Sequence, residues 1–581
     1  MHESRRFFMN KVASFITTAV LTLIFGFVMN YLCLPAWNIH SKGLPVFLVF
    51  VLLFAFFMLA LTGSKPMYKK NRKRGTVVFA TSFDAKTAAA TGAGFVMIAI
   101  GVIAALWILA GFFSSRLFHA TAYSKILQVT DGDVTDIPSA DKTDAIALMD
   151  TASATKLGDR EIGSLSELVS QYEIYSGDYT QVNIGNEPVK VAPLSYAGFF
   201  KWNNNKDKGI PGYVSVSPVN MDAEYISLKE GMVYVPSAYF SEDLERHIRF
   251  AYPTTIFGNV HFEVDEEGNP WYVASTYEYT IGLYGGKTVS GIILVNPMNG
   301  QMQKLPVSEV PAWVDVVYPG SLICSQYNDY AQLQRGYWNS VFGQNGCRKV
   351  TEYTSEDDDD EDAKPDYGYI AKDDDIWIYT GITSVNGDSS NIGFIVANER
   401  TGETKFIEAS GADEFSAMNA AEGEVQEKRY QASFPSLITV GDVPTYIMVL
   451  KDKSGLVKMY ACVNVSQYNI VATASNQDDC IAKYTALLQG KITAEQATGE
   501  GTPDAVTEDT SVVDTTNYES RTITVTKLQT MDVDGNTYLY IVDSEGNVYK
   551  ARYVDVEDML FVNVGDEITI ETDGVNYRYH R

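Results

Sequence analysis

The chain has 581 residues, 46% of them hydrophobic and 20% charged, and its formal net charge is −27. The charge is divided unequally, because residues 1–120 carry 12 basic and 2 acidic residues whereas residues 121–581 carry 33 basic and 70 acidic ones. Nucleic-acid phosphates would repel so acidic a part, which excludes nucleic-acid binding and leaves cations, basic proteins and neutral glycans as candidate ligands.

Three uncharged apolar runs near the N-terminus predict membrane-spanning helices. They cover residues 12–32, 44–62 and 92–113, and each approaches the about 20 residues that a helix needs to cross a bilayer core. The first run is too long for the apolar part of a signal peptide and no small-residue cleavage site follows it, so we expect it to be retained. Residues 1–120 should therefore form a membrane domain with three transmembrane helices.

The distribution of basic residues predicts the orientation of these helices. The loop at 63–91 carries most of the basic residues of this part of the chain, namely Lys65, Lys69, Lys70, Arg72, Lys73, Arg74 and Lys86. The shorter loop before it holds only Lys42. Because Lys and Arg collect in short cytoplasmic loops, we expect a multi-pass protein of a bacterial cell membrane with a cytoplasmic N-terminus. Everything after Phe113 should then be extracytoplasmic.

Residues 121–250 predict the first α+β part of this ectodomain. Helices are expected over 139–158, where Ser139 is a candidate N-cap, and over 163–175. Alternating apolar residues then indicate strands, and residues 241–250 are typical of a short helix with acidic residues first and basic residues last.

The region 251–489 contains an internal repeat. In one copy Trp271 precedes GIILVNPMNGQ at 291–301, and in the next Trp377 precedes GFIVANERTGE at 393–403. Both copies have a glycine, an apolar strand, an asparagine and a second glycine, and a helical segment follows each. A third variant begins at Tyr446. The pattern predicts a tandem α+β unit made of a hairpin and a helix.

The turns of the two copies, Asn296 to Gly300 and Asn398 to Gly402 with their flanking strands, resemble those of PepSY-type extracytoplasmic modules. Those modules also pair a strand that bears such a turn with a helix. The resemblance implies a membrane-associated binding or inhibitory module rather than an enzyme.

Four cysteines fall in the expected ectodomain, and two local disulfides are predicted. An oxidising compartment permits disulfides, and the pairs Cys324–Cys347 and Cys462–Cys480 are each close in sequence. Zinc is the alternative for these thiols. Histidine is scarce and no CxxC spacing occurs, so we expect neither a metal nor a cofactor.

Three further segments complete the chain. The acidic run at 355–366 predicts a solvated loop; it lacks the glycine and closing glutamate of a calcium loop, and whether it binds calcium stays open. Residues 490–520 are typical of a disordered linker. Five or six short strand candidates in 521–581 predict a small β-barrel of the OB or SH3-like kind.

No recognised catalytic motif occurs, which favours a binding protein. Trp271, Tyr272, Trp377 and Tyr379 lie at equivalent ends of the two repeats and are candidate aromatic anchors for a partner. Core packing is the alternative role, and we expect it at least for the two tryptophans.

We therefore expect a non-enzymatic, membrane-anchored scaffold of the cell envelope. It would hold or recognise a protein complex or a second copy of itself. The alternatives are an envelope-acting enzyme whose site is not recognisable and a protein that binds wall glycan.

Overall fold

The computed structural model divides the chain into two compact units, Met1–Gly501 and Thr502–Arg581. The residues that it describes are 2–63, 65–70, 77–82, 93–140, 146–165, 167–185, 187–353, 364–365, 367–385, 390–498, 519–533, 536–552, 556, 562–572 and 577–579. The protein is of the mixed α+β class, as predicted, with most of its strands in antiparallel sheets.

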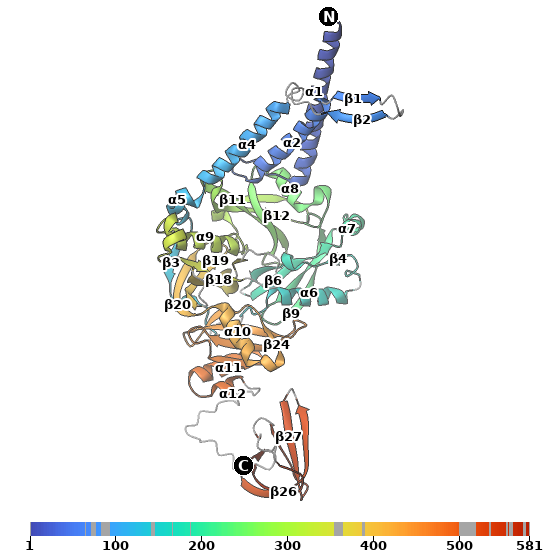
Figure 1. The fold of residues 1–581 in the computed structure, drawn as a ribbon. Helices are drawn as coiled ribbons and strands as arrows, with labels where there is room; N and C mark the ends of the chain where they lie inside the picture. The colour runs from blue at the N-terminus through green and yellow to red at the C-terminus, as the bar shows by residue number, and fades with distance from the viewer. Residues whose placement is uncertain are drawn as a thin grey trace. The chain divides into compact units, whose positions relative to one another are not determined.

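The first unit begins with three long apolar helices that lie side by side (Figure 1). They are α1 (His2–Cys33), α2 (Gly43–Gly63) and α4 (Ala93–Phe113). All three are long and apolar enough to cross a membrane, which confirms the three predicted helices. Large apolar side chains such as Leu23, Phe57 and Phe95 are exposed on their outer faces. A contiguous apolar surface of this size requires cover by lipid or by another protein.

The basic segment between α2 and α4 contains a hairpin of β1 (Lys65–Lys70) and β2 (Val77–Ser82). The side chains of residues 63–91, on which the predicted orientation depends, lie outside the described residues.

Four antiparallel strands followed by a helix form a pattern that occurs four times after residue 179. We call these the first to fourth modules. The first module contains β5 (Thr180–Ile184), β6 (Glu187–Pro193), β8 (Ile210–Ser217) and β9 (Asp222–Met232), and the second contains β10 (Ile256–Val264), β11 (Pro270–Ile281), β12 (Gly285–Val295) and β13 (Met302–Pro306). The third module contains β17 (Gly368–Lys372), β18 (Asp375–Ser384), β19 (Ser390–Asn398) and β20 (Thr404–Ala412). The fourth contains β22 (Ser436–Val440), β23 (Val443–Lys451), β24 (Val457–Asn464) and β25 (Val471–Ala474). The helices that follow are α8 (Leu244–Ala251), α9 (Gly320–Leu333), α10 (Glu414–Glu424) and α11 (Gln477–Leu488).

The repeated Asn–Gly segments form the turns between the last two strands of the second and third modules. Asn296 and Asn398 each accept backbone N–H bonds from the residues two and three positions ahead, at 2.8 to 3.3 Å. Gly300 and Gly402 then adopt left-handed φ values of 72° and 75°. An asparagine side chain that caps its own turn, followed by a residue free to take a positive φ, fixes the hairpin register.

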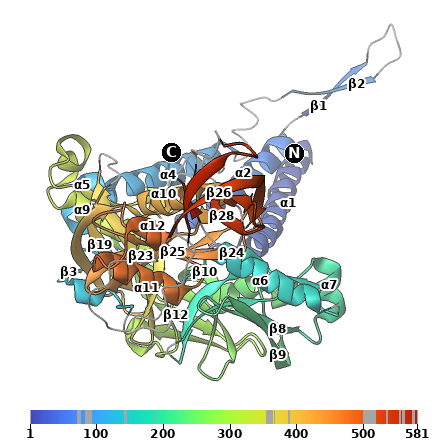
Figure 2. The same ribbon diagram turned by 90° about the horizontal axis from the view of Figure 1, so that it is seen from below.

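The first module was not recognised in the sequence, and its helices differ from those expected. Helix α6 (Thr151–Ser164) begins at the N-cap Asp150, whose carboxylate accepts from the Ser153 N–H, and it packs on β8 and β9 (Figure 2). Ser139, expected as the cap, instead pairs with Thr439. The second expected helix, over 163–175, is wrong, because β4 (Tyr172–Glu173) pairs there with β7 (Ser195–Tyr196).

Two strands extend the sheet of the third module. Strand β14 (Arg348–Val350) pairs with β18, and β3 (Val129–Gly132) runs parallel to β20. The partners Thr130 and Thr404 are 274 residues apart in sequence. The chain that leaves the apolar helices is therefore fixed to the third module.

The turn between β11 and β12 fixes the modules to the apolar helices. The Ser114 hydroxyl, directly after α4, accepts from the backbone N–H groups of Leu283 at 3.0 Å and Tyr284 at 3.3 Å. The carbonyl of Ser114 accepts from the Tyr123 hydroxyl at 2.7 Å. Because the turn makes these contacts through its backbone, it can lie directly against the end of α4.

The loop between α1 and α2 contacts the same region. The backbone N–H of Trp37 donates to the Pro253 carbonyl at 2.8 Å, and a ring nitrogen of His40 lies 2.9 Å from the Leu283 carbonyl oxygen. The C-terminal ends of α1 and α4 therefore meet the modules on one side of the helices.

The second unit contains an antiparallel sheet in the order β28-β27-β26-β29-β30, of which β26 (Glu519–Val533) is the central strand. Its remaining strands are β27 (Asn536–Asp543), β28 (Val548–Arg552), β29 (Glu567–Thr572) and β30 (Tyr577–Arg578). The predicted barrel is not found, because no strand pairing closes the sheet among the described residues of this unit.

The beginning of the predicted linker 490–520 is ordered. It forms α12 (Ala494–Thr498), in which Ala497 is buried against the fourth module and the Thr498 carbonyl accepts from Thr473. Residues 499–518 lie outside the described residues, as do 354–363 of the acidic run.

The contact between α4 and the β11–β12 turn predicts that Gly285 tolerates no side chain. A Cβ there would overlap the Tyr123 hydroxyl and the Ser114 carbonyl oxygen. Gly285→Ala should lower the free energy of unfolding by about 1–3 kcal/mol, measured by thermal unfolding of the full chain in detergent. Gly163→Ala is the matched control, because nothing lies within 4 Å of the Cβ position in that helix. Equal melting temperatures for Gly285→Ala and the control would show that the contact is not formed.

Candidate functional site

The four predicted aromatic anchors are not exposed. Tyr272, Trp377 and Tyr379 are buried, and the partly buried Trp271 donates to the Asp265 carboxylate at 3.0 Å and packs on Trp313. These positions favour the core-packing role that the sequence had left open. Trp271 and Tyr272 are neighbours on β11 and pack in different cores, so both faces of the sheet are covered at this position.

The predicted disulfides are not bonded. None of the five cysteines forms a disulfide in the structure. The sulfurs of Cys462 and Cys480 lie 3.5 Å apart in the core of the fourth module, beyond the about 2.05 Å of an S–S bond. Cys347 instead lies against the Gln332 carbonyl, while Cys324 is buried in the core beneath α9. The prediction that Cys462 and Cys480 lie close together is confirmed, but the predicted bond between them is wrong, because they are two buried free thiols.

An exposed group of aromatic side chains lies on the first module, and we call it the aromatic cluster. Its members come from α7 (Phe199–Asn205) and from the segment before α8, and they are Phe199, Phe200, Trp202, Tyr239 and Phe240. Phe200 is 78% exposed and Phe240 is 56% exposed, whereas Trp202 is buried beneath them. The exposed rings therefore lie over Trp202, which is itself part of the hydrophobic core of the first module.

Ring contacts hold the aromatic cluster in one arrangement. Phe199 packs edge-on against Tyr239 with centroids 5.2 Å apart, and Trp202 lies 5.3 Å from Tyr239 and 5.7 Å from Phe240. The Trp202 indole N–H donates to the Glu242 carboxylate at 2.9 Å. Edge-to-face and tilted pairs at these distances are favourable, so the exposed rings are oriented before any partner binds.

Phe240 also has a strained backbone. Its φ is 56°, in the left-handed region, which is uncommon for a residue with a bulky side chain and costs about 1–3 kcal/mol. The Phe240 carbonyl accepts from the Arg246 guanidinium at 2.6 Å, which stabilises this conformation. Left-handed backbone at an exposed aromatic residue is a feature that gathers at binding sites.

Charges of both signs surround the aromatic cluster. Lys206 lies 5.3 Å from the centroid of the Trp202 ring, and Glu242 is bound to the same side chain. Tyr175 nearby hydrogen-bonds to Glu173, and this bond to a carboxylate raises the pKa of Tyr175 to about 12. Apolar rings within a charged rim are the usual anatomy of a protein-binding surface.

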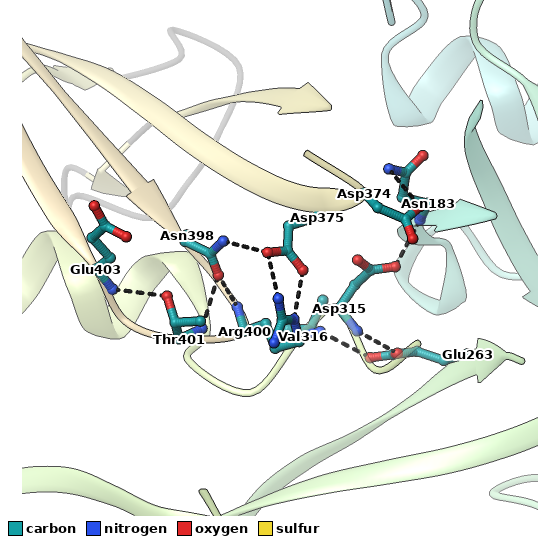
Figure 3. A network of polar contacts seen from close by, with 10 residues as sticks. All are labelled: Asn183, Glu263, Asp315, Val316, Asp374, Asp375, Asn398, Arg400, Thr401 and Glu403. Atoms are coloured by element: carbon teal, nitrogen blue, oxygen red, sulfur yellow. Dashed lines mark hydrogen bonds and ion pairs between the residues drawn. The ribbon is translucent and has the colours of Figure 1, made fainter. Parts of the chain in front are cut away.

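The most perturbed carboxyl groups lie between the modules, where they have a structural role (Figure 3). Asp315 accepts from the backbone N–H of Asn183 in the first module at 2.6 Å, and its own N–H donates to Glu263 of the second at 2.9 Å. In the third module, Asp375 forms a bidentate pair with Arg400 and accepts from Asn398. Asn183 also donates through Nδ2 to Asp374 of the third module at 3.5 Å, so these contacts join the edges of three modules.

Glu399 extends the same junction. It is buried, and its Oε1 accepts from the backbone N–H of Gly320 at the start of α9 at 2.8 Å. Burial raises its pKa to about 8, and the nearby charge of Glu263 adds to this. Burial and the Glu263 charge also raise the pKa of Asp315 well above its usual value. Within the described ranges, no three His, Cys, Asp or Glu side chains gather as a metal site.

A cavity lies where α4 ends, and its volume is about 740 Å³. One side is apolar and belongs to the last turns of α4, with Trp107, Ile108 and Phe112. Its polar lining residues include Lys42, Ser115 and Arg116. The cavity therefore has both apolar and cationic lining residues at the boundary between the helices and the modules.

Sequence reasoning missed the aromatic cluster, although a signal was present. Residues 199–202 read Phe-Phe-Lys-Trp directly after Gly198, and Tyr239 is followed by Phe240. Neighbouring residues on a helix point in different directions around its axis, so a short surface helix cannot bury all of these rings. The equivalent aromatic residues of the repeat are instead the ones that core packing requires.

Comparisons with known proteins assign no family. No protein-family model matches the chain, and no curated protein does, so the PepSY-type resemblance rests on the turn residues alone. Among solved structures, a protein of unknown function from Dyadobacter fermentans is similar over 66% of this chain and 94% of its own, at 11% identity and a TM-score of 0.19.

The junction between the modules predicts a pH dependence of stability. The folded protein holds the Glu399 proton up to about pH 8, whereas the unfolded chain releases it near 4.5. Stability contributed by this group is therefore complete below pH 4.5 and is lost as the pH rises toward 8. Glu399→Gln cannot ionise, so at pH 8 it should be more stable than the wild type by on the order of 3 kcal/mol.

Thermal unfolding of the full chain between pH 5 and 8 would measure this difference. Glu403→Gln, in the same turn region with its side chain 52% exposed, should follow the wild-type curve. If Glu399→Gln loses stability with rising pH as steeply as the wild type, Glu399 is ionised in the folded protein and does not hold a proton at the junction.

Proposed function

We propose that this protein is a non-enzymatic, membrane-anchored binding protein of the cell envelope. Its three apolar helices would cross the cell membrane, and its extracytoplasmic modules would hold a protein partner on the aromatic cluster. The observation that carries the proposal is the set of exposed rings fixed on the buried Trp202, with Phe240 in a left-handed conformation.

The contacts between helices and modules support the membrane topology. The loop at 34–42 and the segment after α4 both touch the β11–β12 turn. Three membrane crossings put these two segments on the same side in either orientation, and the proposed cytoplasmic N-terminus would make that side extracytoplasmic. The basic loop 63–91 would then face the cytoplasm and the anionic headgroups there.

A protein partner fits the aromatic cluster better than a membrane surface does. Glu173 and Glu242 accept hydrogen bonds from Tyr175 and Trp202, and carboxylates are repelled by anionic lipid. Buried aromatic anchors within a mixed-charge rim are where binding energy concentrates in protein interfaces. We expect the partner to offer an apolar cleft or a cation to the rings.

The buried carboxyl groups support binding rather than catalysis. Raised pKa values in carboxyl groups are a sign of catalytic acids. In this protein the oxygens of Asp315 and Glu399 accept backbone N–H bonds that connect neighbouring modules. Their perturbation therefore follows from burial within a structural junction.

The proposal predicts that Phe200 contributes to affinity and not to stability. Phe200→Ala should weaken partner binding about 30-fold, equivalent to about 2 kcal/mol, because an exposed anchor loses its contact area. The melting temperature should stay at the wild-type value. Phe342→Ala is the matched control, since Phe342 is 77% exposed on another part of the first unit.

The partner would be identified with a photoreactive phenylalanine analogue at position 200 in native membranes, with position 342 as the control. A protein adduct specific to position 200 supports the proposal, and its size distinguishes another protein from a second copy of the chain. Adducts to lipid alone would assign the rings to the membrane, and adducts to glycan would assign them to the cell wall. Either result would contradict the proposed partner class.

The topology predicts the outcome of protease treatment of intact protoplasts. Protease added outside should remove everything after Phe113, while an epitope at the N-terminus should survive until the membrane is permeabilised. Modules that resist digestion in sealed protoplasts would reverse the orientation.

A further inference from the structure

The cavity at the end of α4 is built to take an amphiphilic anion. We propose that it binds the phosphate of an anionic membrane phospholipid. This inference rests on the proposed crossing of the membrane by the apolar helices, and it assigns to the protein a ligand site separate from the aromatic cluster.

The position of the cavity matches the headgroup region of a bilayer. Helix α4 ends at Phe113, and Trp107, Ile108 and Phe112 of its last two turns form the apolar side of the cavity. The polar side begins directly after this helix, at Ser114 and Ser115. Tyr123, Tyr284 and Tyr337 line the boundary, where tyrosines are enriched in membrane proteins.

The charge of the cavity is positive, against the charge of the modules around it. Lys42 lines the cavity, and among the described residues its ammonium group has no hydrogen bond or ion pair. Lys287 lies close enough that the Lys42 charge lowers its pKa, after the larger effect of burial. The neighbouring ammonium groups of Lys42 and Lys287 therefore make this part of the boundary between helices and modules positive.

Arg116 and Ser115 supply further donors. The Arg116 guanidinium binds Asp329 through Nε at 2.5 Å and Nη2 at 3.1 Å, which neutralises its charge but leaves Nη1 available. Asp329 therefore does not compete for Lys42. The Ser115 hydroxyl is buried and has no hydrogen-bond partner among the described residues. A buried polar group without a partner is costly, and rotation of the Ser115 side chain toward the cavity would let a phosphate oxygen satisfy it.

A phospholipid accounts for both sides of the cavity. Its phosphate would lie between Lys42, Ser115 and Arg116, and an acyl chain would follow the exposed face of α4. A soluble phosphate would use only the polar side. Because Asp329 neutralises Arg116, the net attraction comes from Lys42, and one such charge at a membrane surface strengthens phosphate binding by roughly a factor of five.

The test uses the full chain in nanodiscs that contain phosphatidylcholine and phosphatidylglycerol in equal amounts. The complex is extracted into detergent, and the retained lipids are counted by native mass spectrometry. Wild-type protein should retain one phosphatidylglycerol molecule in preference to phosphatidylcholine. Lys42→Gln should reduce that retention about five-fold, and Ser115→Ala should reduce it as well.

Lys125→Gln is the matched control, because Lys125 is exposed close to α5 (Arg116–Tyr123) and does not line the cavity. It removes the same charge and should leave retention unchanged. Lys42→Arg should retain the lipid and shows that the effect of Lys42→Gln is one of charge. Melting temperatures of all variants, which should agree, exclude unfolding.

Other outcomes overturn the proposal. Equal retention by wild type and Lys42→Gln would mean that lipid binds around the helices and not in the cavity. Release of the lipid by millimolar inorganic phosphate would identify a site for soluble phosphate. If wild-type protein retains no phosphatidylglycerol but still forms the protein adduct at position 200, the lipid site is rejected and the proposed binding function stands. The protease experiment tests the membrane crossing independently.

Discussion

The hydroxyl of Ser114 accepts two backbone hydrogen bonds from the β11–β12 turn, and this contact determines how the modules meet the apolar helices. Because Ser114 directly follows Phe113, the last residue of α4, no flexible segment separates the helix from its contact with the turn. Gly282 and Gly285 allow the turn to approach that closely, since a Cβ at either would overlap Ser114. The second module is thereby held against the helix end, and the cavity beside α4 exists because Tyr284 of the same turn forms one of its walls.

A second constraint is the removal of carboxyl groups from water between the modules. Glu263, Asp315 and Glu399 are at most 2% exposed, and a buried carboxylate without compensation would cost several kcal/mol. Backbone N–H groups supply that compensation: Asn183 donates to Asp315, Gly320 to Glu399, and Val316 to Glu263. Each bond connects the segment of the carboxyl group to a different segment of the chain. The junction is therefore formed only when neighbouring modules are folded, which makes their stability interdependent.

Much of the architecture was readable from the sequence because it depends on local chemistry. The apolar helices follow from uncharged runs of membrane length, and the hairpins of the second and third modules follow from an asparagine that caps its own turn before a glycine. The first module was missed because α7 interrupts its strands between β6 and β8 and its turns do not repeat the Asn–Gly spacing.

The aromatic residues show where sequence reasoning ends. Trp377 on a strand and Phe200 on a helix are both large and apolar, and the periodicity of each element predicts which face a side chain occupies but not whether another layer covers that face. Coverage depends on contacts between distant segments, as for Trp377, which packs in a core shared with residues of the fourth module. The pairing of thiols failed for a related reason, since closeness in sequence brought Cys462 and Cys480 together but left Cys324 and Cys347 in different surroundings.

The parallel pairing of β3 with β20 has a consequence for synthesis of the chain. Strand β3 emerges directly after the apolar helices, but its partner is made 274 residues later. At about 5–20 residues per second this delay is roughly 15–55 s, during which β3 presents an unpaired edge. Because unpaired strand edges recruit other strands, the nascent protein should depend on a chaperone or on continued contact with the translocation machinery until the third module is complete.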